Sequence, residues 1–476
     1  MATLYWLRND LRLHDNECLH QAIQQKQPLL LVYCFDTRQF EKLNLGFHKT
    51  SYLRFNFLCE SLLALKEDLQ GIGGDLLLRV GYPEFILKKL MEEHGIEHLY
   101  YQKEIASEET AVEEALQKAL VGSNCQIHPI WGKTLYHIED APFSLRDTPI
   151  TSKAFRLQLT KNTAVRPLFP TPTQLPLTPA IKDWGTLPTP EAVGFTKEEI
   201  TSPQQQLVKG GEQEALARLQ YYTFESELAT SYKWTRNRSL GMDYSSKFSP
   251  WMALGSLSPR KIYWQVKEYE QQVKRNISTW WLIFEVVWRD FFKYTALREG
   301  NKIFLEGGFK QREVNWSYEE ALFERWQWGK TGIPFVDAHM RQMNQTGFMS
   351  NRGRVNCASF LTRDYQIDWR WGAAWFESQL LDYDVCSNWL NWSTQALEIW
   401  YTNPVHQSLK YDKEAAYIKK WLPELQPIVG PIAMAPWLLP QKTTNNYPYP
   451  VEVYPKWTRA INNIKKAQEA FDATNS

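Results

Sequence analysis

The residues most able to do chemistry lie in the C-terminal half of this sequence, in short segments that mix charged and apolar side chains. In the first, residues 329–361, Asn351, Arg352 and Arg354 are followed at once by the apolar run VNCASFL. A buried guanidinium without a partner is strongly destabilising. We therefore predict that Arg354 pairs with a carboxylate, and Asp364, just beyond the apolar run, is the predicted partner. A charge pair inside a core marks a candidate site.

A second segment, residues 244–250 with the sequence YSSKFSP, places hydroxyl groups and a lysine at the start of a predicted helix. Serine hydroxyls, an ammonium group and a helix N-terminus together suit a phosphate. The same residues also fit a simple helix cap, in which Ser249 caps a helix that begins at Pro250. Taken alone, the segment leaves both interpretations open.

A third segment, residues 278–292, reads as an apolar helix, STWWLIFEVVWRDFF, with one charged pair. Glu285 and Arg289 are four residues apart and share a helix face, so they can form a pair. Trp281 and Trp288 lie one heptad apart beside them. A buried carboxylate next to an aromatic wall can hold a base-like ligand by hydrogen bonding and stacking. A purely structural role fits this segment equally well.

A fourth segment, residues 380–392, contains two carboxylates, Asp382 and Asp384, followed by Asn388. Paired carboxylates are typical of acid–base catalysis or of a metal site. No histidine lies near them and no further carboxylate completes a ligand set, so we predict no metal. Hydrogen bonding to a polar cofactor ring is the more economical interpretation. A glycosidase-like carboxylate pair is the alternative.

The composition adds one unusual feature, an aromatic content of 14% with 21 Trp. Such residues fill large helical cores, but they also stack on flat cofactors or bases, or relay electrons. The six cysteines form no C-x-x-C pair and are predicted to be buried free thiols of a reducing compartment. No apolar run approaches the length of a membrane span, and the N-terminus shows no signal pattern, so we expect a cytoplasmic protein without a membrane segment.

The elements that must position these residues fall into two kinds. Strand-length apolar runs alternate with helical patterns in residues 1–131, which predicts a doubly wound α/β domain. The predicted strands are residues 3–7, 29–35, 75–80 and 98–101, and the predicted helices are residues 16–25, 48–70, 83–94 and 107–120. RNDLRLHDN follows the first strand in place of G-x-G-x-x-G, so a classical dinucleotide fold is not expected.

The rest of the chain is divided by a proline-rich region. Residues 132–210 contain PLFPTPTQLPLTP and LPTPEAV and are predicted to form a long extended linker. Helical periodicity resumes at Gly211 and continues, with breaks, to about Leu422. The predicted architecture is therefore an α/β doubly wound N-terminal domain, a linker, and an all-α C-terminal domain over residues 211–476.

In their order, these motifs are similar to those of the photolyase/cryptochrome family. RNDLRLHDN, YSSKFSPW, FEVVWRDFF, TGIPFVDAHMRQM, NRGR, ASFL, IDWR and LLDYD occur in the family's order and span almost the whole chain. Within the family, residues 46–50, IEDAPF at residues 138–143 and the SSKFSPW block most resemble the DASH cryptochromes.

The resemblance implies FAD in a U-shaped pose inside the helical domain. In it, Arg354 and Asp364 match a salt bridge beside the flavin ring, and Asn388 matches the residue that faces flavin N5. A neutral amide there fits a mechanism that runs through fully reduced anionic flavin. The positions that match the family's FAD contacts are Tyr232, Ser245, Ser246, Lys247, Phe248, Ser249, Glu285, Arg289, Asn351, Arg354, Asp382, Asp384 and Asn388.

The resemblance also implies a light-driven reaction on DNA. Trp392, Trp369 and Trp316 match the tryptophan chain that carries electrons to photoexcited flavin. The expected activity is that of a deoxyribodipyrimidine photo-lyase, which splits cyclobutane pyrimidine dimers, preferably in single-stranded or looped DNA. The positions that match the lesion-binding residues are Arg236, Glu285, Trp288, Asn351, Val355 and Thr394.

The resemblance further implies a second chromophore and a monomeric state. The α/β domain is expected to hold an antenna, the folate 5,10-methenyltetrahydrofolate, and Glu104 matches a folate-contacting carboxylate. The protein is expected to act as a monomer.

Two positions depart from the DASH pattern. Val355 replaces the usual glutamine after NRGR, and Thr394 replaces the usual tyrosine after Trp392. Both are predicted to line the lesion pocket, where the changes remove hydrogen-bonding or aromatic contact. The main alternative function is a blue-light photoreceptor that binds DNA or protein with little repair. A (6-4) photolyase would need a histidine near position 355, and no histidine lies between His339 and His406.

Overall fold

The protein is described by a computed structural model that covers residues 2–399 and 401–475. Its N-terminal part is a parallel sheet of five strands in the order β3-β2-β1-β4-β5. The strands are β1 (Ala2–Leu7), β2 (Leu29–Phe35), β3 (Leu76–Val80), β4 (Ile96–Gln102) and β5 (Gln126–Ile130). The chain winds outward from β1 to both edges, which confirms the predicted doubly wound α/β domain.

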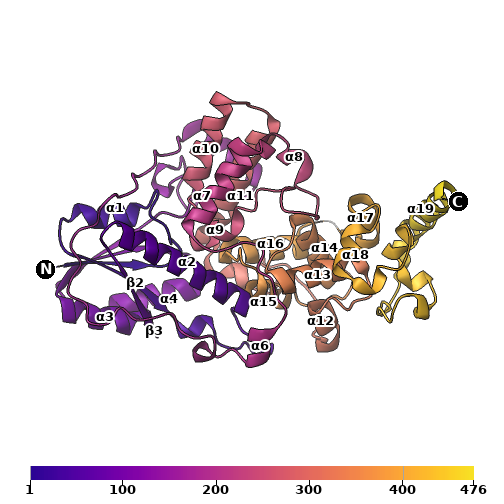
Figure 1. The fold of residues 1–476 in the computed structure, drawn as a ribbon, viewed down its shortest axis with the longest axis horizontal. Helices are drawn as coiled ribbons and strands as arrows, with labels where there is room; N and C mark the ends of the chain where they lie inside the picture. Colours follow the sequence, from indigo (N-terminus) through magenta and orange to yellow (C-terminus); the bar gives the residue numbers. More distant parts are fainter. Residues whose placement is uncertain (1, 400, 476) are drawn as a thin grey trace.

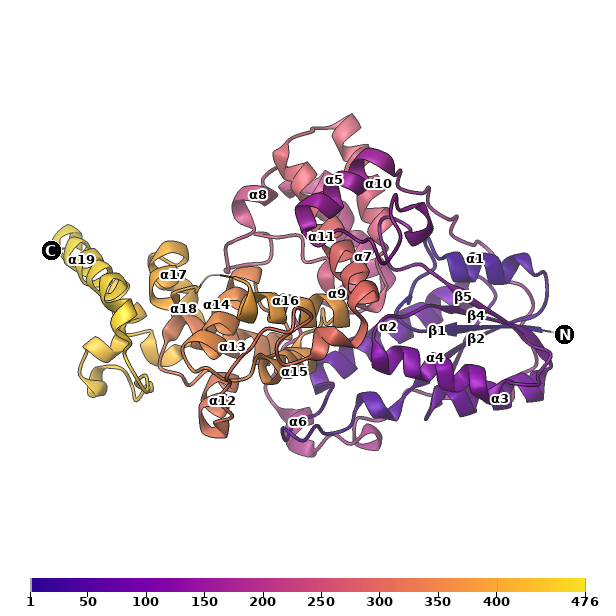
Figure 2. The same cartoon turned by 180° about the vertical axis from the view of Figure 1, so that it is seen from behind.

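Helices cover both faces of this sheet, because successive side chains of a strand point to opposite faces. Tyr5 and Leu7 of β1 pack on the same side as the helices α1 (Glu17–Gln24) and α2 (Tyr52–Gly71). Leu4 and Trp6 pack on the other side. That side is covered by α3 (Pro83–His94) and α4 (Ser107–Ala119). Figures 1 and 2 show α1 and α3 on opposite sides of the sheet.

The segment RNDLRLHDN after β1 fastens the sheet domain to the helical domain. Asp15 forms a buried ion pair with Arg260 at 2.8 Å, and His14 Nδ1 lies 2.6 Å from a carboxylate oxygen of Glu212. Arg12 also donates to the Gly255 carbonyl at 2.8 Å, so the second half of this loop has its partners in the C-terminal part of the chain. The loop serves the junction between the domains, which explains why it lacks the glycines of a dinucleotide-binding turn.

The linker, residues 132–210, runs back over the sheet domain and contains two helices that the sequence did not predict. They are α5 (Ser152–Asn162) and α6 (Lys197–Thr201). The linker is held by backbone bonds such as the one from the Leu175 N–H to the Ile72 carbonyl, at 2.9 Å. It is therefore an ordered covering of the domain surface.

The C-terminal part is helical throughout, and the predicted all-α domain is confirmed. Its helices are α7 (Glu212–Gln220), α8 (Tyr232–Thr235), α9 (Ser249–Leu254), α10 (Pro259–Gln272), α11 (Ile277–Glu299), α12 (Glu320–Gln327), α13 (Pro334–Thr346), α14 (Asn351–Arg363), α15 (Trp369–Gln379), α16 (Val385–Leu397), α17 (Pro404–Tyr411), α18 (Ala416–Trp421) and α19 (Thr458–Asn475). Helix α19 lies at the end of the molecule farthest from the sheet (Figure 1). None of the described helices has both the length and the apolar character needed to cross a bilayer.

A buried carboxylate on α11 ties the linker to the helical domain. Asp290 accepts hydrogen bonds from the backbone N–H groups of Leu135 at 3.0 Å and Tyr136 at 2.9 Å. Burial raises the pKa of Asp290 to about 7, although these bonds and the neighbouring Arg289 oppose the shift. The folded protein therefore retains a proton at pH values where an unfolded Asp, with a pKa of roughly 4, has released it.

This proton makes the stability of the protein depend on pH. Because the folded state binds more protons than the unfolded state between about pH 4 and 7, the contribution of Asp290 to stability falls as the pH rises through that window. Asp290→Asn removes the titrating group, so the midpoint of thermal unfolding should fall less between pH 5 and 7 than it does in the unmodified protein. Equal slopes for the two proteins in differential scanning calorimetry would contradict the assignment.

Candidate active site

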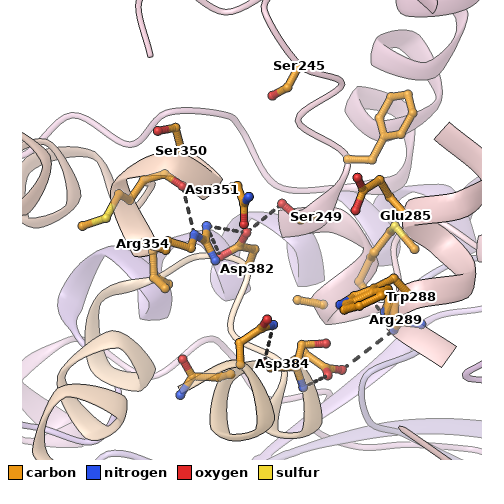
Figure 3. A pocket seen from close by; sticks show the side chains of 18 of the residues that line it. Ser245, Ser249, Glu285, Trp288, Arg289, Ser350, Asn351, Arg354, Asp382 and Asp384 are labelled. Atoms are coloured by element: carbon orange, nitrogen blue, oxygen red, sulfur yellow. Dashed lines mark hydrogen bonds and ion pairs between the residues drawn. The ribbon is translucent and has the colours of Figure 1, made fainter. Parts of the chain in front are cut away.

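The four segments singled out in the sequence meet around one cavity in the helical domain. The cavity measures about 370 Å³, within the size range of small-molecule sites. It lies where α8, α11, α14 and α16 approach one another, and Figure 3 shows its polar side chains pointing toward a shared space. The predicted site residues that line it are Tyr232, Arg236, Ser245, Ser246, Lys247, Phe248, Ser249, Glu285, Trp288, Arg289, Asn351, Arg354, Val355, Asp382, Asp384, Asn388 and Trp392.

Arg354 of α14 pairs with Asp382 and not with Asp364. Its Nη2 atom donates to the two carboxylate oxygens of Asp382, at 2.8 and 3.0 Å. Asp364 caps the far end of the same helix, about 15 Å along the axis, and pairs with Lys456 at 2.6 Å. The predicted Arg354–Asp364 pair is therefore wrong, because a rigid helix carries the two side chains to different neighbours.

Ser249 also joins this polar edge of the cavity. Its hydroxyl donates a hydrogen bond to Asp382 at 2.7 Å, and Figure 3 shows Ser249 and Arg354 on either side of that carboxylate. Helix α9 has Phe248 at its N-cap position, with no capping bond from a side chain. The alternative interpretation of this segment, a helix capped by Ser249, is therefore wrong.

Glu285 and Arg289 share a face of α11, but each has a partner elsewhere. The Glu285 carboxylate forms an ion pair with Arg236 and accepts a hydrogen bond from Trp281 Nε1 at 3.1 Å. Arg289 donates to the carbonyl of Lys133 at 2.5 Å. The Glu285–Arg289 pair that their spacing allows does not form, because segments distant in sequence supply closer partners. Burial raises the pKa of Glu285, and Arg236 opposes that shift.

Asp384 and Asn388, on either side of the start of α16, have different electrostatic states. Burial disfavours the charge on Asp384, but Lys293 and Arg289 outweigh burial and hold its pKa well below the usual range. Asp384 is therefore a fixed anion, ion-paired with Lys293. The Asn388 amide donates from Nδ2 to the Ala373 carbonyl at 3.0 Å, so its Oδ1 atom serves as an acceptor.

Tyr244 and Gln395 are among the cavity-lining residues that were not predicted as site residues, although Tyr244 begins the segment 244–250. The Tyr244 hydroxyl and both amide atoms of Gln395 are buried without a protein partner. Buried polar groups nearly always have partners, so these atoms fit a polar molecule bound in the cavity. The predicted pocket residue Thr394 does not line the cavity. It precedes Gln395 on α16, where consecutive residues point about 100° apart.

Comparison with known proteins identifies the family to which this chain belongs. Residues 281–475 match the family model described as the FAD binding domain of DNA photolyase, and residues 3–174 match the DNA photolyase model. The chain is 44% identical to Cryptochrome DASH of Synechocystis sp. over 98% of this chain and 96% of that protein. It is 41% identical to Cryptochrome DASH of Danio rerio over 96% of this chain and 91% of that protein. The chain belongs to the photolyase/cryptochrome family.

Solved structures agree with this assignment. The crystal structure of the Synechocystis sp. cryptochrome superposes with a TM-score of 0.91, and the two chains are 44% identical over 98% of this chain and 99% of that one. A bacterial class III photolyase from Agrobacterium tumefaciens superposes with a TM-score of 0.83 at 26% identity, covering 100% of this chain and 98% of that one. The predicted resemblance to DASH cryptochromes is confirmed.

The family model identifies FAD as the cofactor of the helical domain, and the residues at the cavity fit it. Lys247 is only 3% exposed, yet its ammonium contacts the Ser245 hydroxyl at 2.9 Å and the Tyr244 ring rather than a carboxylate of the described chain. Burial, together with the nearby Arg218 and Arg354, lowers its pKa well below the usual value. A buried cation of this kind is stabilised by an anionic ligand, which a diphosphate provides.

Lys247→Met tests whether Lys247 helps to hold FAD, because it should raise the stability of the apoprotein and lower the affinity for FAD. Without FAD, the apoprotein should become more stable by roughly 1–3 kcal/mol, because a buried amino group that has no carboxylate partner is removed. FAD should bind about tenfold or more weakly, since a hydrogen bond to a charged group contributes roughly 1.5–3 kcal/mol. Urea denaturation of the apoprotein and titration with FAD measure the two effects. Lys88→Met, at an exposed position on α3, is the control, and a variant that shifts neither quantity contradicts the role of Lys247.

The three tryptophans predicted to carry electrons differ in their surroundings. Trp392 lines the cavity, and its ring presses on α15 at Gly372, where an added Cβ would lie 2.3 Å from the ring. Gly372 is one helical turn from the fully buried Trp369. The half-buried Trp316 precedes Ser317, whose bridge to Ile367 brings it next to the start of α15. Their role in electron transfer stays a prediction.

Glu104 lies at the junction between the domains rather than in the cavity. Its buried carboxylate forms an ion pair with Lys133 and accepts a hydrogen bond from Asn9 at 3.2 Å. The next residue, Ile105, packs in a cluster with Phe292 of α11. A carboxylate can accept about four hydrogen bonds, so Glu104 keeps the capacity to accept from the amino group of a folate. The antenna stays a prediction at this place.

Proposed function

We propose that this protein is a blue-light-dependent photolyase that repairs cyclobutane pyrimidine dimers, preferably in single-stranded DNA. The observation that carries the proposal is that one cavity has two parts whose side chains differ in chemistry. Ser249, Arg354 and Asp382 form a polar edge next to the buried Lys247, whereas Trp288 and Glu285 form an aromatic and acidic part on α11. The first part suits FAD and the second suits the two joined pyrimidine bases of the dimer.

In the proposed mechanism, the chain binds and orients rather than exchanging protons. The residues around Lys247 and Arg354 would hold reduced FAD, which would supply the light-driven electron transfer that splits the dimer. Asn388 presents an amide oxygen, which can accept a hydrogen bond but cannot protonate the cofactor. Asp382 fixes the Arg354 guanidinium through two hydrogen bonds. The proposed reaction needs no general acid at the flavin, and Asn388 provides none.

The lesion contacts are proposed for the α11 side of the cavity. Trp288 offers a ring for stacking and belongs to an aromatic row with Phe284 and Phe292, whose ring centroids lie at 5.9 and 5.8 Å from it. Glu285, held by Arg236, offers a carboxylate to the N–H groups of the bases. Val355 lines the same cavity and adds only apolar contact, so recognition of the lesion depends mainly on Trp288 and Glu285.

Preference for single strands follows from the cost of bringing the lesion into an enclosed cavity. A dimer in a duplex must be unpaired and unstacked first, whereas a dimer in a single strand needs no unpairing. Next to Arg236, the side chain of Trp234 is 69% exposed, with Lys233 4.9 Å from its ring centroid. An exposed ring beside cationic groups is a typical platform for a single-stranded base and its phosphate.

We also propose an antenna chromophore, an oligomeric state and a cellular compartment for the protein. A folate, 5,10-methenyltetrahydrofolate, is proposed to bind near Glu104 at the domain junction. From there it would pass excitation energy to FAD in the neighbouring helical domain. Burial raises the pKa of the nearby Glu109 carboxyl to about 7, with Glu104 adding to the shift. The six cysteines are unpaired and five are buried, which supports a reducing compartment such as the cytoplasm. We propose that the protein acts as a monomer.

Illumination of the reduced protein with thymine-dimer oligonucleotides tests this function. We expect dimers to disappear from single-stranded oligonucleotides under blue light and to persist in the dark, with slower loss from the duplex. Binding of the damaged strand without loss of dimers under light would favour the alternative, a blue-light photoreceptor with little repair.

A further inference from the structure

One arginine of α7 holds the loop that leads into α9. Within this loop, residues 242–248, the side chains of Ser245, Ser246 and Lys247 line the FAD cavity. Arg218 lies on the other side of the loop and does not line the cavity. Figure 1 shows α7 next to α9. No motif in the sequence marks Arg218 as a site residue.

Arg218 binds this loop mainly through the loop's backbone. Its guanidinium donates to the carbonyl oxygens of Ser246 at 3.0 Å, Ser245 at 3.1 Å and Met242 at 3.3 Å. A further bond reaches the Asp243 carboxylate at 2.8 Å. A guanidinium carries five N–H donors in a fixed plane, so one side chain can hold several carbonyls at once. Arg218 therefore sets the orientation of the two peptide groups that follow Ser245 and Ser246.

These two peptide groups turn their N–H sides away from Arg218. In a planar trans peptide, such as those of the described chain, the carbonyl of one residue and the N–H of the next point in opposite directions. The carbonyls of Ser245 and Ser246 face Arg218. The N–H groups of Ser246 and Lys247 therefore face the opposite side, toward the cavity that both residues line. Neither N–H group has an acceptor within the described part of the chain.

The backbone at Lys247 also depends on this support. Its φ is 62°, in the left-handed region that residues other than glycine seldom adopt. Such a conformation persists only where the surrounding contacts enforce it. The bond from Arg218 to the Ser246 carbonyl fixes the peptide group directly before Lys247. Successive backbone N–H groups around a left-handed residue form a concave site that binds anions.

Arg218 is itself held in one place by its neighbours. Its side chain is only 12% exposed, and its guanidinium carbon lies 5.3 Å and 5.2 Å from the ring centroids of Tyr221 and Tyr222. The Tyr221 hydroxyl donates at 3.1 Å to the same Asp243 carboxylate that pairs with the arginine. The guanidinium is therefore a fixed support for the loop rather than a mobile surface charge.

We propose that Arg218 is a positioning residue for the diphosphate of FAD. It acts from behind the 242–248 loop and holds the N–H groups of Ser246 and Lys247 toward the place where a phosphate meets the Lys247 ammonium. The inference rests on FAD as the ligand of the cavity and is independent of light-driven repair. Because the support serves the diphosphate, Arg218 governs how strongly the site prefers FAD over a flavin that lacks this group.

Titration of the apoprotein in the dark with FAD and with riboflavin, which lacks the diphosphate, tests the proposal. Arg218→Met should weaken the binding of FAD about tenfold, because the hydrogen bonds to a charged group are lost, and should leave the affinity for riboflavin unchanged. A merely structural role would lower both affinities alike. Equal losses for the two flavins, or an unchanged affinity for FAD, would overturn the proposal.

A matched control and a milder variant complete the test. Arg298→Met removes another arginine that is 11% exposed and donates to a backbone carbonyl, that of Thr148, at a place outside the cavity. It should leave both flavin affinities unchanged. Arg218→Lys keeps the charge but not the planar fork that reaches three carbonyls, so it should lose part of the preference for FAD. Full retention of that preference in Arg218→Lys would show that the charge alone matters and would contradict the positioning role.

Discussion

Asp382→Asn should purify with little or no FAD. The carboxylate of Asp382 holds the Arg354 guanidinium by two hydrogen bonds and accepts a third from Ser249. An amide can accept at only one of its two positions and leaves the arginine charge without its counter-ion. The loss of such a charge-assisted contact costs roughly 2–3 kcal/mol. We therefore expect FAD to bind about 100-fold more weakly to this variant in a fluorescence titration.

Asp364→Asn is the matched control for this experiment. Asp364 lies on the same helix as Arg354 and was its expected partner from the sequence, but in the structure it pairs with Lys456 and accepts from Tyr401. Its replacement should leave the affinity for FAD unchanged, with at most a small loss of thermal stability. If Asp364→Asn lost FAD as severely as Asp382→Asn, the pairing seen in the structure would not govern the cofactor site.

Trp369→Phe should abolish the light-driven reduction of oxidised flavin by an external thiol. Trp369 is fully buried, and in the predicted electron-transfer chain it stands between the cavity-lining Trp392 and the half-buried Trp316. A phenyl ring is much harder to oxidise than an indole, so the substitution interrupts electron transfer while it keeps an aromatic side chain in the core. Absorbance of the flavin during blue illumination measures the effect.

Dimer splitting provides the internal check on this variant. When the flavin is reduced chemically beforehand, Trp369→Phe should split dimers as the unmodified protein does, because the electron then starts at the flavin. Trp457→Phe, another fully buried tryptophan, is the control and should photoreduce normally. Photoreduction of Trp369→Phe at the unmodified rate would show that electrons use another path, for example through Trp389, whose ring centroid lies 5.7 Å from that of Trp369.

The sequence predicted which segments form the site better than it predicted which side chains pair inside it. The alternation of strands and helices in residues 1–131 and the periodicity after Gly211 depend on local patterns, and both domain types were found. Segments as far apart as residues 244–250 and 380–392 were expected at one site because of their chemistry and motif order. The structure places both of them around the same cavity.

The errors concern partners chosen by long-range packing. Arg354 and Glu285 each had a plausible neighbour in sequence, Asp364 and Arg289, but each pairs with a residue from another segment. Spacing along the sequence determines only which residues share a helix face. The partner on a neighbouring segment depends on how the two segments pack against each other.

Other features had no local signal at all. Helix α5 lies within a proline-rich region, where the surrounding composition hid its pattern. The contacts of Arg218 with the 242–248 loop join two segments that no motif of the sequence connects, so no single stretch of sequence could reveal them.

The central claim is that FAD and the damaged bases occupy one cavity, side by side. A titration in the dark tests it most directly, with the FAD-loaded protein and a short single strand that carries one thymine dimer. We predict a saturable shift of the flavin absorption bands, no shift with the undamaged strand, and loss of the shift in Trp288→Ala without loss of FAD. A damaged strand that binds while the flavin spectrum stays the same as with undamaged DNA would contradict the claim.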